Sequence, residues 1–430
     1  MKRPIPQLFL LAVISSCSAF GQINCISGSA ANKLVCEFPI STGILNNVGA
    51  LGGATGTAAQ SSITTATAIN TGIATQVSQL PLASASAGTV EVYKNGIYET
   101  FNNLGPILVD RAQTIGKGKV FIGGTASQFV FNKIDGISLG SLPFAYTQYV
   151  QNPTTGQTQT TIYTSETTNL SFRMNQFVGV ATIGVTNRID FSIIVPIERV
   201  SLGATALNSK SYVQNTGSTT AVGPVSNPNI YTNGTASGVG DLNFNVKSVL
   251  QRGERATYSA GFTLRTPTGD DLNLLGSGSF GFNPYVVYSY LARISPHAKI
   301  GYQWNTKSEL NNPTLVAGGN RSLPGGLNYD IGADWAMARR VTVAADLLGN
   351  QYLNTPTYVA VTTSIATTTG TQTLQSSTVG NQSYTISSLS TGVKLNLFKT
   401  IVMSANLLTQ LNNSGLHSRP TPLLGLSCRF

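Results

Sequence analysis

Apolar and polar residues alternate with a period of two along most of the chain after residue 117. In residues 242–247, for example, Leu242, Phe244 and Val246 alternate with polar side chains. This spacing is typical of a β-strand whose two faces meet different environments. Twelve segments follow the pattern and are predicted to be strands: 118–132, 168–185, 189–201, 239–251, 255–266, 279–293, 297–307, 326–337, 340–351, 383–397, 400–411 and 419–430.

The connections between these segments alternate in length. Short turns fall at 186–188, 252–254, 294–296, 338–339 and 398–399, and longer polar loops at 133–167, 202–238, 267–278, 308–325, 352–382 and 412–418. An even number of strands with this alternation is typical of a membrane barrel with its turns in the periplasm. A soluble two-sheet sandwich would also alternate, but its solvated face would carry more charge. We therefore predict an all-β fold, a transmembrane antiparallel β-barrel of about 12 strands over residues 118–430.

Composition and charge narrow the classes further. Charged residues make up 10% of the chain, whereas soluble proteins carry about a quarter. After the N-terminal segment, the sequence contains no run of apolar residues long enough for a membrane-spanning helix. The formal net charge of +10 is spread thinly along the chain, so we expect no nucleic-acid partner. An outer wall that faces lipid fits this composition, and outer-membrane lipid is an expected partner.

The polar face of the strands predicts which side chains point into the barrel. Charges in a narrow interior must pair across the lumen or face water, and rings of charge along a solute path would tune selectivity. The sequence leaves open which of these roles each residue has. The candidate lumen residues are Asp190, Glu198, Asn243, Asn245, Lys247, Arg265, Lys299, Gln303, Asp330, Asp334, Asp346, Lys394, Asn396 and Arg429.

The C-terminal strand ends on an aromatic residue. Counting back from Phe430, the residues Cys428, Leu426, Leu424 and Pro422 share one face, and polar or small residues occupy the other. A final amphipathic strand that ends in Phe resembles the signal that the barrel assembly machinery of bacteria reads. We expect that machinery to be a partner, with Phe430 as the assembly signal.

The N-terminus has the features of a secretory signal. Lys2 and Arg3 precede a short apolar core, and Ala19-Phe20-Gly21 offers small residues at a cleavage site. Residues 1–22 are therefore predicted to be a signal peptide of an exported bacterial protein, located in the outer membrane. The series that ends at Cys17 also fits a lipoprotein cleavage box, and this alternative stays open.

Residues 23–117 are predicted to form an N-terminal extension. Cys25 and Cys36 lie close together in an exported, oxidising setting, which favours a disulfide between them. Apolar residues between 63 and 80 recur at helical spacing and predict a weakly amphipathic helix before Pro81. The extension could form a periplasmic arm, a plug inside the lumen, or a flexible linker.

Signs of catalysis are sparse, and we expect no enzyme activity, no cofactor and no metal site. His297 is predicted in a periplasmic turn, and His417 in an external loop next to Ser418. An outer-membrane phospholipase would need a Ser-His-Asn arrangement, but neither histidine has a suitable serine together with an asparagine or aspartate around it. No metal-ligand spacing and no phosphate-binding glycine loop occurs in the sequence.

Several short motifs in the barrel region resemble the outer-membrane β-barrel family linked to the meta-pathway of phenol degradation. They are Gly238-Val239-Gly240-Asp241 before Lys247, Arg265-Thr266-Pro267-Thr268-Gly269-Asp270, residues 276–284, and the Tyr/Trp strand at 297–304. That family is distantly similar to outer-membrane transporters of fatty acids and aromatic hydrocarbons. The resemblance implies passive uptake of small molecules, with aromatic or apolar compounds as the candidates. It does not identify the solute, and the polar lumen predicted above argues mildly against a purely hydrophobic conduit.

Two functions therefore follow from the sequence. The first is an outer-membrane channel whose extension forms a plug or a periplasmic arm. The alternative is a non-conducting structural or surface-display barrel whose long external loops bind ligands or cells. A lumen closed by Asp–Lys pairs between strands would favour the second function.

Overall fold

The computed structural model describes residues 33–37, 69–77, 90–94, 97–101, 104, 108–151, 158–311, 320–398 and 400–430. The predicted signal peptide of residues 1–22, Cys17 and Cys25 lie outside these residues, so the Cys25–Cys36 disulfide stays a prediction. Among the described residues, no helix is long and apolar enough to cross a membrane.

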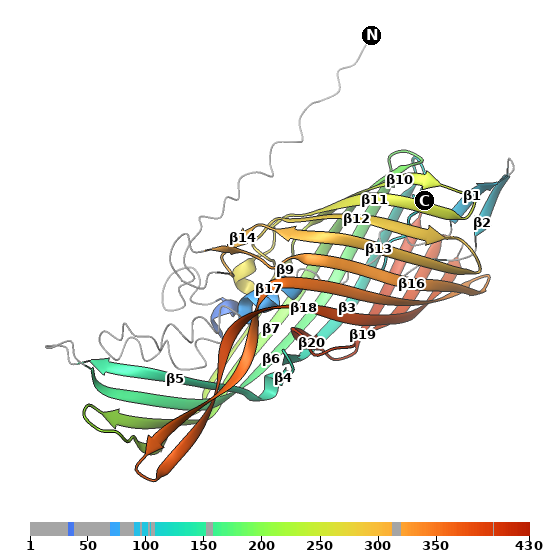
Figure 1. The fold of residues 1–430 in the computed structure, drawn as a ribbon. Coiled ribbons are helices and arrows are strands. Elements are labelled where there is room, and N and C mark those ends of the chain that lie inside the picture. The colour runs from blue at the N-terminus through green and yellow to red at the C-terminus, as the bar shows by residue number, and fades with distance from the viewer. Residues whose placement is uncertain are drawn as a thin grey trace.

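Twelve antiparallel strands close into a barrel, as the sequence predicts (Figure 1). Around the barrel the order follows the chain, and the last strand pairs with the first. The strands are β3 (Val120–Ile134), β6 (Thr158–Gly184), β7 (Ile189–Asn215), β10 (Asn243–Arg252), β11 (Ala256–Arg265), β12 (Gly281–Tyr290), β13 (Ile294–Asn305), β16 (Gly326–Ala338), β17 (Val341–Thr367), β18 (Gly370–Phe398), β19 (Ile401–Gln410) and β21 (Thr421–Arg429).

Shorter elements decorate this barrel. Three 3₁₀ turns occur among the described residues, at η1 (Leu34–Cys36), η2 (Leu139–Ser141) and η3 (Asp271–Asn273), and residues 69–77 form an α-helix. The additional strands are β1 (Val90–Lys94), β2 (Ile97–Phe101), β4 (Ile137–Ser138), β5 (Leu142–Gln151), β8 (Val222–Ser226), β9 (Ile230–Val239), β14 (Lys307–Ser308), β15 (Arg321–Ser322) and β20 (Leu416–Ser418).

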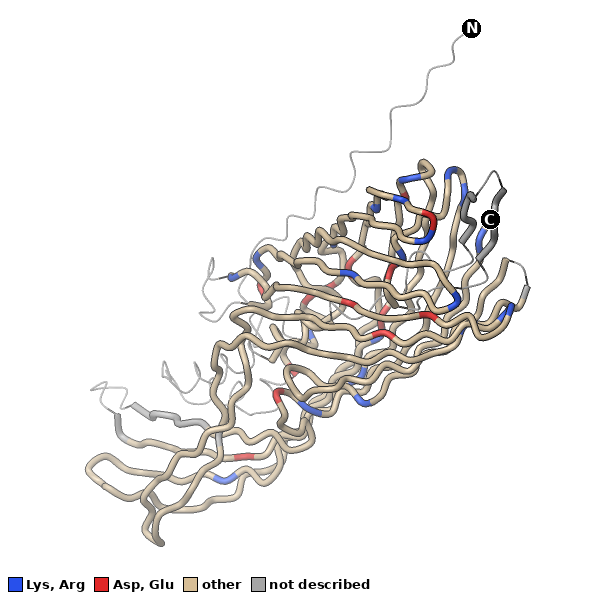
Figure 2. The backbone as a smooth tube through the Cα atoms, turned by 45° about the vertical axis from the view of Figure 1, so that its right-hand side comes forward, with Lys and Arg blue, Asp and Glu red and all other residues tan. Residues whose placement is uncertain are grey.

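The two ends of the barrel differ, and we name them by their connections. At the short-turn end the strands are joined by tight turns, and the C-terminus lies there too (Figure 1). At the long-loop end the paired strands β6–β7 and β17–β18 continue well past the barrel as hairpins. Figure 2 shows few charged residues along these hairpins.

The hairpins correct our prediction of loops at 133–167, 202–238 and 352–382. β17 and β18 remain paired from Thr355–Gln382 to Thr367–Gly370, with one irregularity after Tyr352. The segments were predicted to be loops because they are polar, but they are rich in threonine. Threonine is β-branched and fits a pleated strand even where neither face is apolar.

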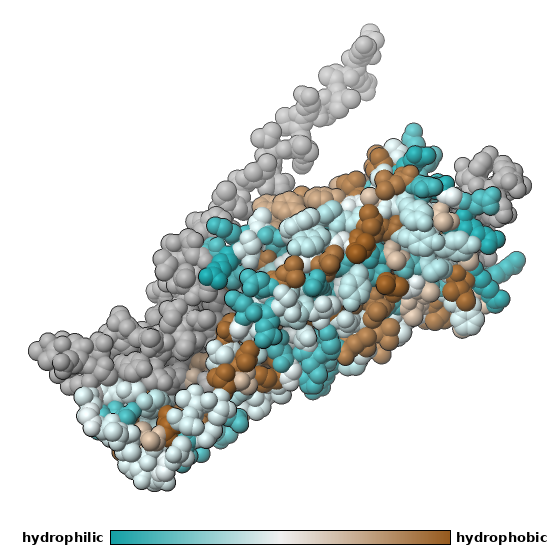
Figure 3. All heavy atoms as spheres, in the orientation of Figure 1, coloured by the Kyte–Doolittle hydropathy of each residue, from teal (hydrophilic) through white to brown (hydrophobic). Residues whose placement is uncertain are grey.

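The outer surface of the barrel is apolar between its two ends. Ile300, Ile331 and Leu424 point outward and are 50%, 57% and 63% exposed, and Figure 3 shows apolar patches over this surface. Trp304 lies near the long-loop end of β13, and Trp335 lies near the short-turn end of β16. Aromatic residues at both edges of an apolar band are typical of strands that cross a bilayer.

Both histidines lie on strands, which corrects their predicted positions. His297 belongs to β13 and is 3% exposed, with its ring in the lumen. Pro296 suggested a turn, but the strand already begins at Ile294 and Pro296 is opposite Ala333 of β16. His417 lies on β20, which pairs with β3, and its Nδ1 is 2.9 Å from Asn132 Oδ1.

The apolar band predicts how the barrel responds to charge on its outer face. Replacement of Ile331 by arginine should destabilise the folded barrel in a bilayer by about 2–4 kcal/mol, because arginine near the midplane is poorly solvated. Val361→Arg on the protruding part of β17, where Val361 is 36% exposed, should cost less than about 1 kcal/mol. Urea titration of folding into vesicles measures both values. Equal losses of stability in the two variants would mean that the bilayer does not surround the barrel at the level of Ile331.

Candidate functional site: the barrel lumen

One side of the lumen is apolar. The inward side chains of β3, β6 and β7 include Phe131, Phe172 and Leu202, which are at most 6% exposed. The rings of Phe131 and Phe172 stack with their centroids 4.7 Å apart. They belong to the same buried cluster as Ile69 and Ile73 of the helix. The prediction of a polar lumen is thus wrong on this side, because the wall packs against a helix inside the barrel.

This packing also explains why residues 168–185 carry apolar side chains on both faces of the strand. Gln176, Met174 and Val178 all point inward, whereas Phe177 points outward and is 48% exposed. The pairing with β7 is continuous from Thr167 to Gly184, and the irregularity lies between Ser165 and Thr167. The strand therefore has no bulge at Gln176 and carries apolar residues on both faces.

The opposite side of the lumen is polar. The structure places the candidate lumen residues there and along β7 and β21. Ten of them are buried: Asp190, Glu198, Asn243, Asn245, Lys247, Arg265, Gln303, Asp334, Asp346 and Lys394. Four are half-buried: Lys299, Asp330, Asn396 and Arg429. Their role as the lining of a solute path stays a prediction.

Leu104 and residues 108–118, here called the plug segment, pass through the lumen near the short-turn end. Arg111 is 2% exposed, and its guanidinium lies 3.7 Å from Asp334 Oδ2 of β16. Lys247 of β10 donates a hydrogen bond of 2.7 Å to the Arg111 carbonyl. Lys299 of β13 lies 3.7 Å from Asp110 Oδ2. The segment therefore supplies partners for charges on three strands.

The backbone of the plug segment is held on both sides of Arg111. The amide of Leu104 donates to Thr342 Oγ1 at 3.1 Å, and Lys394 Nζ donates to the Leu104 carbonyl at 3.3 Å. The amide of Ile115 donates to Asp190 Oδ2 at 3.0 Å, and Arg429 donates to the Ile115 carbonyl at 3.0 Å. These contacts reach β17, β18, β7 and β21, so the segment is anchored around most of the barrel.

Ala112 sits between these anchors. Its amide donates to Ser289 Oγ at 3.0 Å, and its carbonyl accepts a short hydrogen bond from Ser259 Oγ. Both serines are buried, on β12 and β11. Sequence reasoning did not single out these serines, and their position on the polar face of the strands is the signal that could have found them.

His297 belongs to the same group of lumen side chains as Arg111 and Asp334. Its Nε2 lies 2.8 Å from Asp346 Oδ1, and its Nδ1 lies 3.7 Å from Asp334 Oδ2. The sequence could have shown this position, because Ser295, His297 and Lys299 alternate with outward residues. His297 thus brings Asp334 and Asp346 into one cluster of polar side chains on the lumen face of the wall. We did not predict this proximity from the sequence.

The helix of residues 69–77, here called the plug helix, fills the lumen nearer the long-loop end. All nine residues are buried. Thr71 donates to the Leu310 carbonyl at 2.6 Å, and Gln76 contacts both Tyr384 (3.0 Å) and the amide of Leu416 (2.7 Å). The helix thus contacts three parts of the wall that lie far apart in sequence.

Residues 33–37 cap the same end. Lys33 Nζ lies 2.8 Å from Asp270 Oδ2. Although burial opposes it, hydrogen bonds from Lys33 and Asn273 hold the pKa of Asp270 below its ordinary value. Nearby, burial and then the neighbouring Asp271 raise the pKa of Glu309 to about 7. The Lys33–Asp270 ion pair therefore helps to hold residues 33–37 against the long-loop end.

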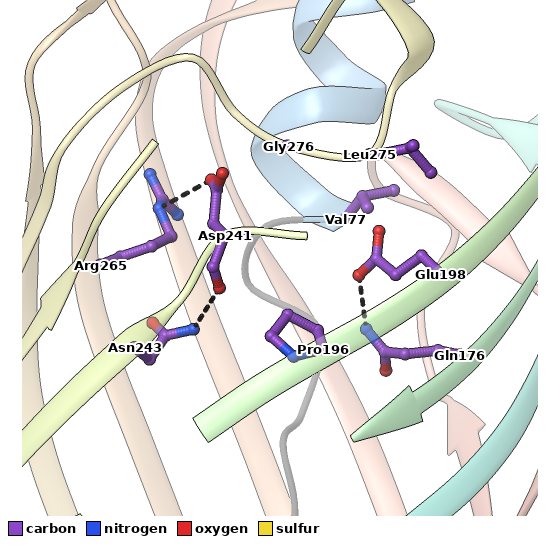
Figure 4. A pocket seen from close by; sticks show the side chains of 9 residues that line it. All are labelled: Val77, Gln176, Pro196, Glu198, Asp241, Asn243, Arg265, Leu275 and Gly276. Atoms are coloured by element: carbon purple, nitrogen blue, oxygen red, sulfur yellow. Dashed lines mark hydrogen bonds and ion pairs between the residues drawn. The ribbon is translucent and has the colours of Figure 1, made fainter. Parts of the chain in front are cut away.

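A small cavity of about 20 Å³ remains between the plug helix and the wall, with room for about one water molecule (Figure 4). Here β7 changes partner, from β10 up to Ile194 to β9 from Ile197, and the chain between those strands turns inward. The Gly240 amide donates to the Pro196 carbonyl at 2.9 Å. The residues that line the cavity are Val77, Gln176, Pro196, Glu198, Asp241, Asn243, Arg265, Leu275 and Gly276.

A closed barrel with an apolar outer wall and a filled lumen defines a transmembrane β-barrel protein. The chain belongs to the family described as "Putative MetA-pathway of phenol degradation", whose model matches residues 150–415. This match confirms the family resemblance that the barrel motifs indicate.

Similar solved structures are also barrels. An outer membrane channel from Pseudomonas putida F1 is 11% identical, with a TM-score of 0.44, over 74% of this chain and 98% of that chain. A FadL homologue from Pseudomonas aeruginosa is 11% identical, with a TM-score of 0.30, over 73% and 90%. The toluene transporter TodX of Pseudomonas putida is 8% identical, with a TM-score of 0.24, over 73% and 88%. No curated protein matches the sequence.

The anchors of the plug segment predict a local response to mutation. Arg111→Ala removes the partner of buried Asp334, so the amides of Ala112 and Ile115 should exchange with solvent at least about tenfold faster. Arg188→Ala, which changes an exposed arginine at the same end, should leave these rates unchanged. Hydrogen exchange with mass spectrometry measures both variants. Unchanged protection in Arg111→Ala would show that the ion pair does not hold the segment.

Proposed function

We propose that the protein is an outer-membrane channel for passive uptake of small molecules, closed at rest by its own N-terminal extension. In this proposal the short-turn end faces the periplasm and the long-loop end faces the outside, as in other barrels with such connections. The plug segment then lies on the periplasmic side of the lumen, and the plug helix lies on the external side.

One observation carries the proposal: a separate stretch of chain, rather than side chains of the wall alone, fills the barrel. Lys247, Lys299 and Lys394 all contact the plug segment. A non-conducting barrel could instead neutralise its inward charges by pairs between adjacent strands. Charges whose partners lie on a displaceable segment become available to water and solute when that segment moves.

The two-sided lumen supports a solute that is small and partly apolar. A wall with aromatic residues on one side and hydrogen-bonding groups on the other resembles the lining of small-molecule sites, which are mostly apolar with a few placed polar groups. The family description, with its link to phenol degradation, fits an aromatic molecule. The stacked rings of Phe131 and Phe172 offer no polar groups to an ion, so they do not fit a wholly polar ion pore.

The alternative is a display barrel, and the protruding hairpins favour it. β17 and β18 contain 27 and 29 residues, far more than the roughly 10 that cross a bilayer. Such hairpins could hold a ligand or another cell away from the membrane. This function does not need the lumen to open, so a conductance measurement distinguishes it from transport.

A reversible lock of the plug segment tests the channel. Cysteines in place of Ala112 and Ser289 put two thiols where the plug segment contacts β12, and mass spectrometry verifies that the disulfide forms on oxidation. In planar bilayers the oxidised double variant should stay closed. After reduction it should show the same transient openings as the wild-type protein.

Wild-type protein under both redox conditions controls for effects on its native cysteines, and the single variant Ala112→Cys controls for the substitution. Equal conductance of the locked and reduced forms would exclude the plug segment as the gate. Silence of every form, together with silence of a barrel lacking residues 26–117, would favour the display function.

A further inference from the structure

The short turns of the barrel carry exposed arginines. At least one lies in, or directly beside, each of the turns that join β6 to β7, β10 to β11, β12 to β13 and β16 to β17. The six exposed arginines of these turns, here called the arginine belt, are Arg188, Arg252, Arg255, Arg293, Arg339 and Arg340. They are scattered along the sequence, and the closed barrel brings them to one end of the molecule.

Backbone hydrogen bonds hold these turns beside one another. The carbonyl groups of Arg188, Arg255, Arg293 and Arg340 each accept an amide hydrogen bond of 2.8 or 2.9 Å from the strand, or strand end, that follows around the barrel. The same contact is thus repeated at all four turns. Figure 2 shows basic residues gathered at this end of the barrel. The belt therefore follows the edge of the barrel rather than forming a single cluster.

Few negative charges oppose the belt. None of its six arginines forms an ion pair with a residue that the structure describes. Among the side chains described in these turns, Glu254 is the exposed acidic one, and the terminal carboxylate of Phe430 lies at the same end. At the long-loop end, by contrast, Lys33 is paired with Asp270. The short-turn end is therefore strongly positive and suited to an anionic partner.

The belt borders the apolar outer surface of the barrel. Arg188 directly precedes Ile189 and Arg293 directly precedes Ile294, and these isoleucines are 36% and 58% exposed. Trp335, which is 42% exposed, lies at the same edge on β16. An arginine at such a boundary lays its alkyl stem along apolar surface and keeps its guanidinium in the polar layer. The guanidinium groups are therefore placed at the level of lipid headgroups.

We propose that the arginine belt binds the phosphate groups of anionic phospholipids in the leaflet around the short-turn end. A guanidinium offers phosphate two parallel N–H donors, and an anionic bilayer surface attracts each arginine close to it. An acidic soluble protein would meet only the tips of the turns and would gain nothing from the apolar surface beside them. The inference goes beyond the channel proposal and does not depend on it, because it needs only a barrel in a bilayer.

Spin-labelled lipids test the proposal. The protein is reconstituted in phosphatidylcholine vesicles with a trace of spin-labelled phosphatidylglycerol or phosphatidylcholine, and electron paramagnetic resonance gives the fraction of each label immobilised at the barrel. The wild-type protein should prefer phosphatidylglycerol at least about threefold. The triple variant Arg293→Gln, Arg339→Gln and Arg340→Gln should lose at least about half of this preference. Equal association of the two labels with the wild-type protein would overturn the proposal.

A matched variant separates the belt from the net charge of the protein. Lys210→Gln, Lys307→Gln and Arg321→Gln remove the same charge from exposed positions at the long-loop end, and this triple variant should keep the wild-type preference. An equal loss of preference in the two triple variants would assign the effect to net charge and overturn the role of the belt.

Salt provides a test on the wild-type protein alone, which holds even where a variant does not fold. Screening shortens to about 3 Å at about 1 M salt, so the preference should fall at least about twofold there. An unchanged preference would overturn the electrostatic assignment. Retention of polyglutamate by vesicles that contain the protein, without any lipid preference, would assign the belt to an acidic protein instead and overturn the lipid proposal.

Discussion

Hydrogen bonds between β21 and β3 close the barrel and give every other strand two neighbours. A strand edge facing lipid would leave its amides and carbonyls unpaired, and hydrocarbon offers them no partner. The chain closes the ring at its end, where Val120 and Phe430 exchange two backbone hydrogen bonds of 2.8 and 3.0 Å. Once the ring is closed, every strand has one face toward lipid and one toward a shared interior.

That interior then needs to be filled, and the N-terminal extension fills it in two ways. The plug segment meets the polar side with charges and backbone groups, as in the Arg111–Asp334 pair. The plug helix meets the apolar side, where Ile69 and Ile73 share a cluster with the phenylalanines of the wall. A cavity is left where neither fits, at the place where β7 changes partner beside Pro196.

Three layers of the molecule meet at this cavity. The wall supplies Glu198, the helix supplies Val77 and the loop at the long-loop end supplies Leu275. A segment held by many individually modest contacts can be displaced as a unit, since its groups regain hydrogen bonds to water when they leave.

The barrel could be predicted from the sequence alone. Alternation in segments such as 242–247 and the alternating lengths of the connections predict twelve strands, because period-two patterning and turn length are local properties. Their bounds are close to those observed except where β6, β7, β17 and β18 extend into the hairpins. The pairing of the threonine-rich hairpins was missed, since polar strands lack that pattern. The tertiary structure was needed to show which lumen charges meet and why Met174 and Val178 face inward. These features depend on the plug segment and the plug helix, which lie far away in sequence. A local hydrophobic pattern carries no information about what packs against the wall from inside the barrel.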